Sequence, residues 1–460
     1  MKKLHHIVIE HPAWFTSGRF YFKPKFLTSY FLKINEWAIA RMEKDSIEDM
    51  EQLQLSRLKN LLDFASDNIE YWKEIFRSNN FRNIGSVEEF KKIPITDKKI
   101  LQARPIEDFT AKFKGSRFFP VTSFGTTGRP LRFYLDTYTR ERRAALRFRV
   151  YRWLGAKRGD IFLKVVRNAI FYEKSVVIKA ADFSALPKVK DFLYSLENSD
   201  HYILDSYPSF LIFLANLIKK ERNALPLRAV ISSAESVSNT EQKILESVFC
   251  CPTGRRYTSR EGSGTIAQTC RLGAFHLNID QVFVEIVDND YKSLPVGATG
   301  KIIITDFNNY AMPFIRYELG DLGSYDHNPC SCGLPFPVFR FEGRSMGVFK
   351  LPSGKIIHSF SLISLLHRRR EWVYQYQIIR EARDIFNFLI VPGAGYMPGD
   401  EEMLMSQLEE IFDDDILINI KIVPKIIVPQ NERFRPFISK VADDAEFGRF
   451  EKFQSASPSL

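Results

Sequence analysis

The sequence predicts an α/β fold with a substantially parallel sheet, followed by a smaller C-terminal domain. After residue 120, short apolar runs such as 161–166 and 202–206 alternate with helix-length segments, the pattern of β-α-β units. From residue 275, apolar and polar residues alternate more strictly, as in half-buried antiparallel strands. The 460 residues suffice for one large and one small domain, and we place the boundary near Arg344.

The individual elements follow from periodicity and turn signals. Residues 45–80 carry leucines at three- and four-residue spacings after acidic residues, which predicts a helix. Residues 120–136 predict a strand, a glycine-rich loop and a second strand. The other expected elements are a basic helix at 138–153, strands at 160–166, 201–207 and from 227, helices at 207–220 and 239–249, strands within 276–288 and 300–307, a hairpin at 348–357, and a disordered tail after Val441.

Composition describes an ordinary globular protein, with 45% hydrophobic and 26% charged residues, and excludes a disordered chain. The net charge of +10 predicts a scattered basic surface, and no nucleic-acid signature accompanies the arginines of residues 142–149. The five cysteines are too few for a disulfide framework. Since there is neither a signal peptide nor an apolar run of about 18 residues, we expect a cytoplasmic protein without an integral membrane segment, whose oligomeric state stays open.

The N-terminal segment 15–37 is rich in aromatic residues and lysines. This composition predicts an arm that packs on the rest of the protein, with contact to a membrane surface as the alternative. The pair His5-His6 is interpreted as part of a frayed terminus.

A loop rich in hydroxyl groups and glycine, TSFGTTGRP at residues 122–130, is the strongest local signal. Its glycines let the backbone approach an anion, its hydroxyls can donate to phosphate oxygens, and Arg129 neutralises charge. The spacing differs from that of the G-x-x-x-x-G-K-[ST] loop. Composition alone leaves two interpretations, a phosphate-binding loop and a surface turn.

Four segments, in the same order along the chain, resemble motifs of the adenylate-forming superfamily, which includes acyl-CoA synthetases. The loop at 122–130 resembles its phosphate loop, and residues 256–261 resemble its aromatic-x-x-x-Glu motif. Residues 317–321 resemble Y-x-x-G-D, and Gly343-Arg344 resembles the Gly-Arg that opens the hinge. Within the superfamily, the sequence is most similar to the phenylacetate-CoA ligase branch, with its CapK-like members. The similar segments include LKNLLDFASDNIEYW, SYPSFLIFLANLI and MPFIRYELGD.

This resemblance implies a large N-terminal adenylate-forming domain, residues 1–344, with mixed sheets flanked by helices, and a small mobile α+β domain, residues 345–460. The implied reaction is attack of a carboxylate on the α-phosphate of ATP, giving an acyl-adenylate and pyrophosphate, with Mg²⁺ stabilising charge. The acyl group then passes to CoA or a carrier thiol, or to an amine or hydroxyl. The acyl pocket is expected near Tyr257 and residues 262–264.

The resemblance also implies roles for individual residues. A carboxylate at Glu261 suits Mg²⁺, which prefers oxygen ligands, and a carboxylate at Asp321 suits the vicinal hydroxyls of ribose. The implied catalytic residues are Glu261, Arg344 and Arg433; the implied nucleotide-binding residues are Ser123, Gly125, Thr126, Thr127, Gly128, Ser233, Ala234, Glu235, Tyr257 (stacked on adenine), Thr258 and Asp321.

Three departures from the family pattern leave alternatives open. Phe124 replaces a Ser or Gly of the phosphate loop, and Met346-Gly347 stand where relatives carry an Asp hinge pair. Arg433 occupies the position of the C-terminal catalytic lysine, and a planar, forked guanidinium is no simple substitute for an ammonium. Lys425 or Lys440 is a candidate replacement, and a catalytically degenerate nucleotide-binding protein is the alternative function.

Three cysteines and a histidine form a second constellation: Cys270, His276, Cys330 and Cys332. A C-x-C-G turn can present two thiolates to one ion, and Cys₃His is a common set of ligands for structural zinc. The two halves lie far apart in the sequence, so spacing alone leaves free cysteines and a surface histidine as the alternative. A similar pattern in the branch favours zinc. Cys250 and Cys251 are predicted to be core residues.

Overall fold

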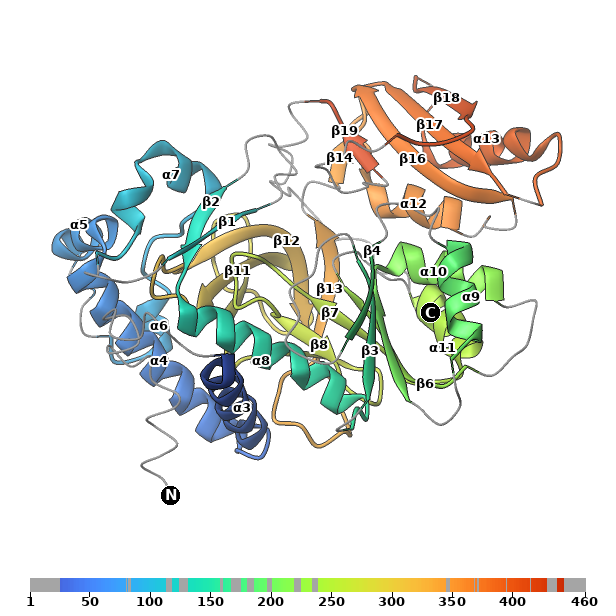
Figure 1. Cartoon of the computed structure of the whole chain (residues 1–460). Coiled ribbons are helices and arrows are strands. Elements are labelled where there is room, and N and C mark those ends of the chain that lie inside the picture. Colours follow the sequence, from blue (N-terminus) through green and yellow to red (C-terminus); the bar gives the residue numbers. More distant parts are fainter. Residues whose placement is uncertain are drawn as a thin grey trace. The chain divides into compact units, whose positions relative to one another are not determined.

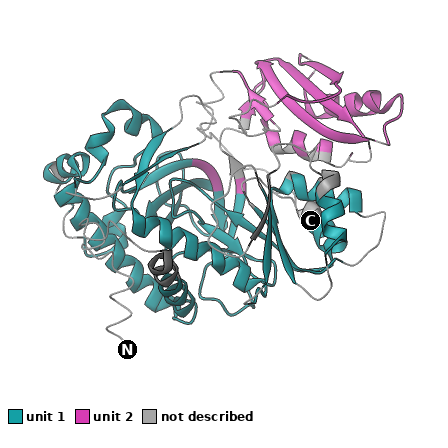
Figure 2. Ribbon diagram, in the orientation of Figure 1, with its two compact units in different colours: residues 1–319, 323–341 teal, residues 320–322, 342–460 magenta. Residues whose placement is uncertain are grey.

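The computed structural model divides the chain into two compact units (Figure 2). Unit 1 comprises residues 1–319 and 323–341, and unit 2 comprises residues 320–322 and 342–460. The predicted domain boundary at residue 344 stays a proposal. The residues that the structure describes, to which all structural statements refer, are 25–79, 81, 84–112, 118–123, 131–157, 160–166, 175–179, 186–196, 201–218, 225–233, 239–344, 348–367, 369, 372–393, 395–413, 415–427 and 437–441.

The N-terminal part of unit 1 is helical (Figure 1). The helix predicted over residues 45–80 is two helices, because Ile69 has extended backbone (φ −117°, ψ 118°) and a fully buried side chain. The first of these starts at a capping box, in which Ser46 and Asp49 each bond the other's backbone amide (3.1 and 3.2 Å). The helices are α3 (Lys25–Met42), α4 (Ile47–Asn68), α5 (Glu70–Asn79), α6 (Val87–Phe90), α7 (Lys98–Ala103) and the 3₁₀ turn η1 (Ile106–Phe109).

A seven-stranded sheet follows, in which five strands pair in parallel and two more join antiparallel. This arrangement confirms the prediction of a substantially parallel sheet. In sheet order the strands are β4 (Ser175–Lys179), β3 (Ile161–Val166), β5 (Tyr202–Ser206), β6 (Leu227–Ser233), β7 (Thr253–Tyr257), β8 (Ala267–Thr269) and β9 (Phe275–Leu277), and the associated helices are α8 (Thr137–Trp153), α9 (Leu186–Tyr194), α10 (Pro208–Ile218) and α11 (Asn239–Phe249).

A second, four-stranded sheet corrects one expectation about burial. Residues 282–287 form an antiparallel pair with residues 300–306, but they are buried on both faces rather than half-buried. The polar residue of the alternation, Glu285, is buried because Arg316 pairs with it (2.8 Å). In sheet order the strands are β10 (Val282–Val287), β11 (Gly300–Asp306), β12 (Tyr317–Tyr325) and β13 (Phe339–Arg344), and a separate hairpin is formed by β1 (Phe119–Thr122) and β2 (Arg132–Leu135).

Unit 2 has its own core, and its first hairpin confirms the one predicted over residues 348–357. Arg380 is fully buried there, with its guanidinium 4.6 Å from the ring centroid of Phe349 and 5.4 Å from that of Phe386. The elements are β14 (Val348–Lys350), β15 (Ile356–His358), α12 (Ser359–His367), α13 (Asp400–Ile411) and a sheet of β18 (Leu417–Ile422), β17 (Ile385–Pro392), β16 (Val373–Ala382) and β19 (Phe437–Ser439).

Helix α8 points two of its arginines into the core, although the sequence suggests a basic, solvated face. Arg149 forms a two-point ion pair with Asp280 (2.8 and 2.6 Å), and both side chains are fully buried. Burial alone would raise the pKa of the Asp280 carboxyl, but the Arg149 guanidinium outweighs it and holds this pKa below its usual range. Arg142, also buried, donates to Gln281 Oε1 (2.9 Å), and Arg57 of α4 donates to the Asp280 carbonyl.

The described part of the N-terminal arm is packed on the rest of unit 1. In α3, Asn35 and Ile39 are buried, and Asn35 Oδ1 accepts a hydrogen bond from Arg142 (3.2 Å). The opposite side of the helix is open to solvent, since Trp37 is half exposed. His5, His6 and the tail after Val441 lie outside the described residues. Among the helices described, none combines the length and the apolar character needed to span a membrane.

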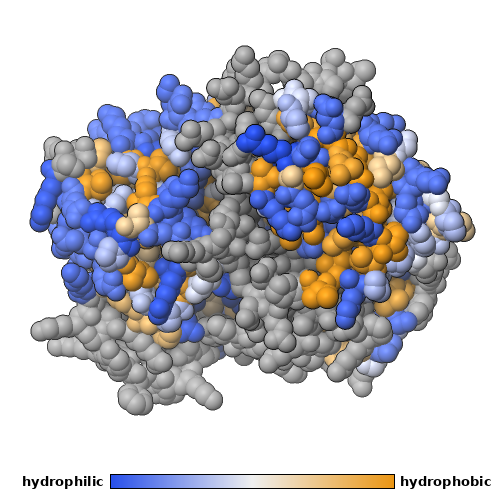
Figure 3. Space-filling model, turned by 90° about the horizontal axis from the view of Figure 1, so that it is seen from above, coloured by the Kyte–Doolittle hydropathy of each residue, from blue (hydrophilic) through white to orange (hydrophobic). Residues whose placement is uncertain are grey.

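Of the two cysteines predicted to be core residues, the structure corrects Cys250, whereas Cys251 packs against a hydrophobic core cluster. Cys250 is exposed with a left-handed φ of 50°, because it lies in the turn that follows α11. Cys251 is half-buried, and burial raises the pKa of its thiol to about 12. Hydrophobic residues reach the surface elsewhere, among them Met397 and Ile427, and the face in Figure 3 mixes hydrophilic and hydrophobic patches.

Replacing Arg149 by methionine should lower the free energy of unfolding of unit 1 by about 3–5 kcal/mol, because Asp280 would stay buried without its ion-pair partner. Urea denaturation followed by tryptophan fluorescence measures the change. Arg152→Met is the matched control: this arginine of the same helix is partly exposed, and its partner Glu43 keeps its second bond from Arg149, so the loss should be less than about 1 kcal/mol. Equal losses in the two variants would contradict the importance of the buried pair.

Candidate functional site

Ser123 and Leu131 flank the segment rich in hydroxyl groups and glycine, and we call this pair of residues the loop neck. There Ser123 N donates to Leu131 O (2.7 Å), and Leu131 N donates to Ser123 Oγ (3.0 Å). β1 and β2 pair antiparallel up to the neck, which confirms the two predicted strands. The buried Ser123 hydroxyl still has its own proton to donate. Gly125, Thr126, Thr127 and Gly128 lie outside the described residues.

The carboxylate of Glu261 lies in the loop that follows β7. Ser259 Oγ donates to Glu261 Oε2 (2.7 Å) and accepts from Glu261 N (3.1 Å), which orients the half-buried carboxylate. The adjacent Arg260 donates from Nη1 to Thr122 O, the residue before Ser123. The structure therefore brings the aromatic-x-x-x-Glu motif and the loop neck together.

A buried polar cluster that sequence reasoning missed supports the Glu261 loop. Asp306, at the end of β11, accepts from Ser263 N (3.0 Å), from Ser263 Oγ (2.5 Å) and from Asn308 N (2.9 Å). Arg143 of α8 pairs with Asp306 (3.1 Å) and donates to Arg260 O (2.7 Å). The available signal was an aspartate that ends a buried apolar strand, where an unpaired charge is costly.

Tyr257 ends β7, a strand that a buried ion pair fixes to its neighbours. Arg256 pairs with Asp205 of β5 (3.0 Å), which also accepts from Tyr151 Oη of α8 (2.7 Å). Because side chains alternate along a strand, Tyr257 points to the opposite face, where its ring lies 4.6 Å from that of Phe341. Only 8% of Tyr257 is exposed. The next residue, Thr258, is half-buried.

Asp321 lies in β12 and is buried. The start of this strand is fixed by Thr96, which accepts from Glu318 N (2.8 Å) and donates its own amide to Arg316 O (2.9 Å). Burial raises the pKa of the Tyr317 hydroxyl, and the negative charge of Glu261 adds to the effect, so these two motif residues are electrostatic neighbours. Arg344 ends β13 and Ser233 ends β6, and the structure describes the backbone but not the side chain of each. The described residues do not include Ala234, Glu235, Phe124, Met346, Gly347 and Arg433.

The three cysteines and the histidine of the second constellation come together. Their ligand atoms all lie within 4.8 Å of one another, with Cys270 Sγ 3.7 Å from Cys330 Sγ and Cys332 Sγ 3.4 Å from His276 Nε2. His276 Nδ1 donates to Phe336 O (2.6 Å), so Nε2 is the nitrogen left to bind an ion. Burial lowers the pKa of His276, which favours the neutral ring that a metal ligand requires.

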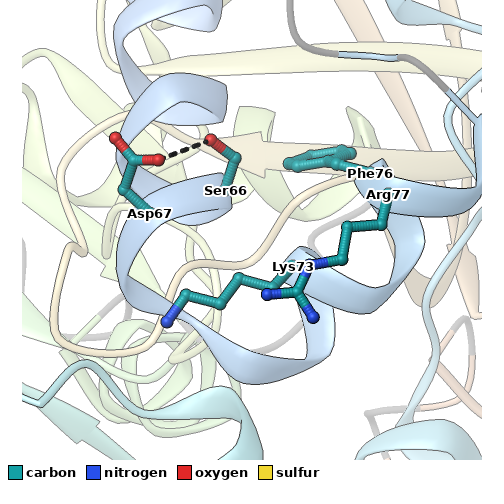
Figure 4. Close-up of a pocket in the computed structure, with 5 residues that line it drawn as sticks. All are labelled: Ser66, Asp67, Lys73, Phe76 and Arg77. Carbon is teal, nitrogen blue, oxygen red and sulfur yellow. Dashed lines mark hydrogen bonds between the residues drawn. The ribbon is translucent and has the colours of Figure 1, made fainter.

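A cavity of about 330 Å³ lies at α4 and α5, and none of the candidate site residues lines it (Figure 4). It is lined by Ser66, Asp67, Lys73, Phe76 and Arg77, none of which the sequence assigns to a site. Ser66 Oγ donates to Asp67 Oδ1 (3.4 Å), and Lys73 pairs with Glu70 at the surface (3.8 Å). The cavity therefore receives no functional assignment.

Comparison with known proteins identifies relatives, although no protein-family model matches the chain. Protein CapK of Staphylococcus aureus is 22% identical over 325 residues, which is 66% of this chain and 68% of CapK. The phenylacetate-coenzyme A ligase of Thermus thermophilus is 22% identical over 312 residues, which is 62% of this chain and 68% of the ligase.

Solved structures share the fold. 2-Hydroxyisobutyryl-CoA ligase in its postadenylation state, in complex with 2-HIB-AMP, has a TM-score of 0.70 at 16% identity, covering 89% of this chain and 94% of the ligase. The same ligase with 2-HIB-AMP and CoA in its thioesterification state has a TM-score of 0.58 at 17% identity, covering 87% and 91%. The chain is therefore similar in sequence to CapK and to phenylacetate-coenzyme A ligase, and it shares its fold with 2-hydroxyisobutyryl-CoA ligase.

Proposed function

We propose that this protein is an ATP- and Mg²⁺-dependent ligase that activates a carboxylic acid as an acyl-adenylate and transfers the acyl group to CoA or a similar thiol. The observation that carries the proposal is the junction of the loop neck with the Glu261 loop through Arg260 and Thr122. A phosphate loop and a carboxylate for Mg²⁺ must lie side by side to hold a triphosphate. The adenylate and CoA complexes of the structural neighbour support the same chemistry.

At the phosphate end, Ser123, Thr126, Thr127 and Gly128 would donate hydrogen bonds to the β- and γ-phosphates, and bound Mg²⁺ would neutralise part of their charge. Glu261 fits this ion, because its half-buried carboxylate is a hard oxygen donor that Ser259 holds in place. Arg344 would add positive charge from the end of β13.

At the adenosine end, Asp321 would accept hydrogen bonds from the two ribose hydroxyls, while Tyr257 and Thr258 would contact the base. Ser233, at the end of β6, with Ala234 and Glu235 would line the other side of the base. Carboxyl ends of parallel strands are the usual ligand-binding edge of such sheets, and β6 and β7 both end there.

A second candidate function is nucleotide binding without adenylation, and Arg433 at the lysine position favours it. Both candidate replacements, Lys425 and Lys440, are exposed, and Lys440 pairs with Glu381 (2.7 Å). A third candidate function is adenylation followed by transfer of the acyl group to an amine or hydroxyl acceptor.

Pyrophosphate exchange with a panel of carboxylic acids separates these functions. We expect exchange with at least one acid, and a thioester product when CoA is added. Exchange without a thioester would move the assignment to an amine or hydroxyl acceptor. Nucleotide binding without exchange for any acid would support the degenerate function instead.

The substitution Asp321→Ala should weaken ATP binding about tenfold or more, because a buried carboxylate that accepts hydrogen bonds from both ribose hydroxyls would be lost. Arg433→Lys should leave binding unchanged and, if anything, raise the exchange rate, because it restores the ammonium group found in relatives. Calorimetry and exchange assays on both variants test this. Equal loss of binding in the two would contradict the site assignment.

We further propose that Cys270, His276, Cys330 and Cys332 bind a structural zinc ion. Tetrahedral Zn–S bonds of about 2.3 Å place two sulfurs about 3.8 Å apart, and the Cys270–Cys330 separation is 3.7 Å. Four protein ligands leave no open position for a substrate, which points to a structural role. The ion would join the β8–β9 hairpin to the segment between β12 and β13.

Purified protein should contain one zinc ion per chain, measured by inductively coupled plasma mass spectrometry. Cys332→Ser should remove it and lower the thermal midpoint by several degrees, since zinc binding contributes to folding. Cys250→Ser, at an exposed cysteine outside the cluster, is the control and should keep the zinc. Folded wild-type protein without zinc, prepared in the absence of chelators, would contradict the assignment.

A further inference from the structure

Arg260 has a position that its exposure alone does not explain. Its side chain lies at the surface, yet its Nη1 donates to the carbonyl of Thr122, the last residue of β1. Thr122 precedes Ser123 at the loop neck, and Glu261 directly follows Arg260. One side chain therefore links the two segments to which the proposed function assigns the triphosphate and Mg²⁺.

The backbone of Arg260 is fixed separately from its side chain. Its carbonyl accepts from Arg143 Nη1 (2.7 Å), and Arg143 Nη2 pairs with Asp306 (3.1 Å), whose side chain is fully buried. Asp306 also holds Ser263, a residue with an unfavourable left-handed φ of 26°. The Glu261 loop is thus anchored to the core on one side, and the Arg260 guanidinium extends from this anchored backbone to the loop neck.

We propose that Arg260 is a positioning residue that sets the separation between the loop neck and the Glu261 carboxylate, so that both can hold the same Mg²⁺-bound triphosphate. This inference rests on the proposed function. A charge-assisted hydrogen bond to a backbone carbonyl is directional, so its loss should let the two loops move apart. The adenosine part of the nucleotide is assigned to other residues, Tyr257 and Asp321, and its binding should be largely unaffected.

Titration calorimetry with Mg²⁺·ATP and, separately, with AMP tests the proposal on the full chain. Arg260→Ala should weaken Mg²⁺·ATP binding about tenfold and leave AMP binding unchanged within about twofold. Arg260→Lys keeps a charged donor on a long side chain and should restore part of the loss. A merely structural role would weaken both nucleotides together.

Arg132→Ala provides the matched control. Arg132 lies on β2 directly opposite Thr122, is exposed, and its guanidinium lies 5.9 Å from the ring centroid of Tyr134. Arg132→Ala removes one positive charge beside the loop neck, as Arg260→Ala does, but it leaves the hydrogen bond between Arg260 and Thr122 intact. We expect Mg²⁺·ATP affinity to stay within about twofold of the wild type.

Three results would overturn the inference: unchanged Mg²⁺·ATP binding in Arg260→Ala, equal weakening of AMP, or an equal loss in Arg132→Ala, which would assign the effect to charge alone. These results differ from a failure of the proposed function. In that case the wild type itself would bind no Mg²⁺·ATP, and the inference would fall with it.

Discussion

The buried ion pair between Arg149 and Asp280 is the interaction on which the arrangement of unit 1 depends. Arg149 belongs to α8, and Asp280 to the turn before β10, which also receives Arg57 from α4. Glu43, beyond the end of α3, accepts from the same guanidinium (3.1 Å). Removing two charges from water is costly, and only a complete set of hydrogen bonds offsets that cost. The three helices and the turn must therefore assemble together.

The same helix connects this core to the candidate site. Arg143 lies on α8 six residues before Arg149. Its side chain pairs with Asp306 and donates to the carbonyl of Arg260. The turn that carries Asp280 also reaches the site, since Gln281 O lies 2.7 Å from Ser263 Oγ. The loop with Glu261 thus rests on fully buried polar groups, which hold a binding group in place better than an unsupported surface loop does.

The cysteine and histidine cluster lies beside the same network. The ring of Phe336, whose carbonyl orients His276, has its centroid 4.8 Å from the Arg149 guanidinium. Leu277 N donates to Pro337 O (3.0 Å), so the segment that carries Cys330 and Cys332 is held against β9 by backbone bonds as well. A zinc ion there would stabilise the far edge of the sheet whose other strands carry Asp205 and Tyr257.

The sequence alone determined the class of fold and most elements, because periodicity and turn residues are local properties. It predicted the strand–loop–strand around Ser123 and the hairpin at 348–357, and it named the four members of the cysteine and histidine cluster. Only the tertiary structure decided which arginines of α8 are buried, that β10 is covered on both faces, and that Arg260 reaches Thr122. These outcomes depend on side chains that meet from distant segments, and a charged residue has the same local pattern whether water or a buried partner satisfies it.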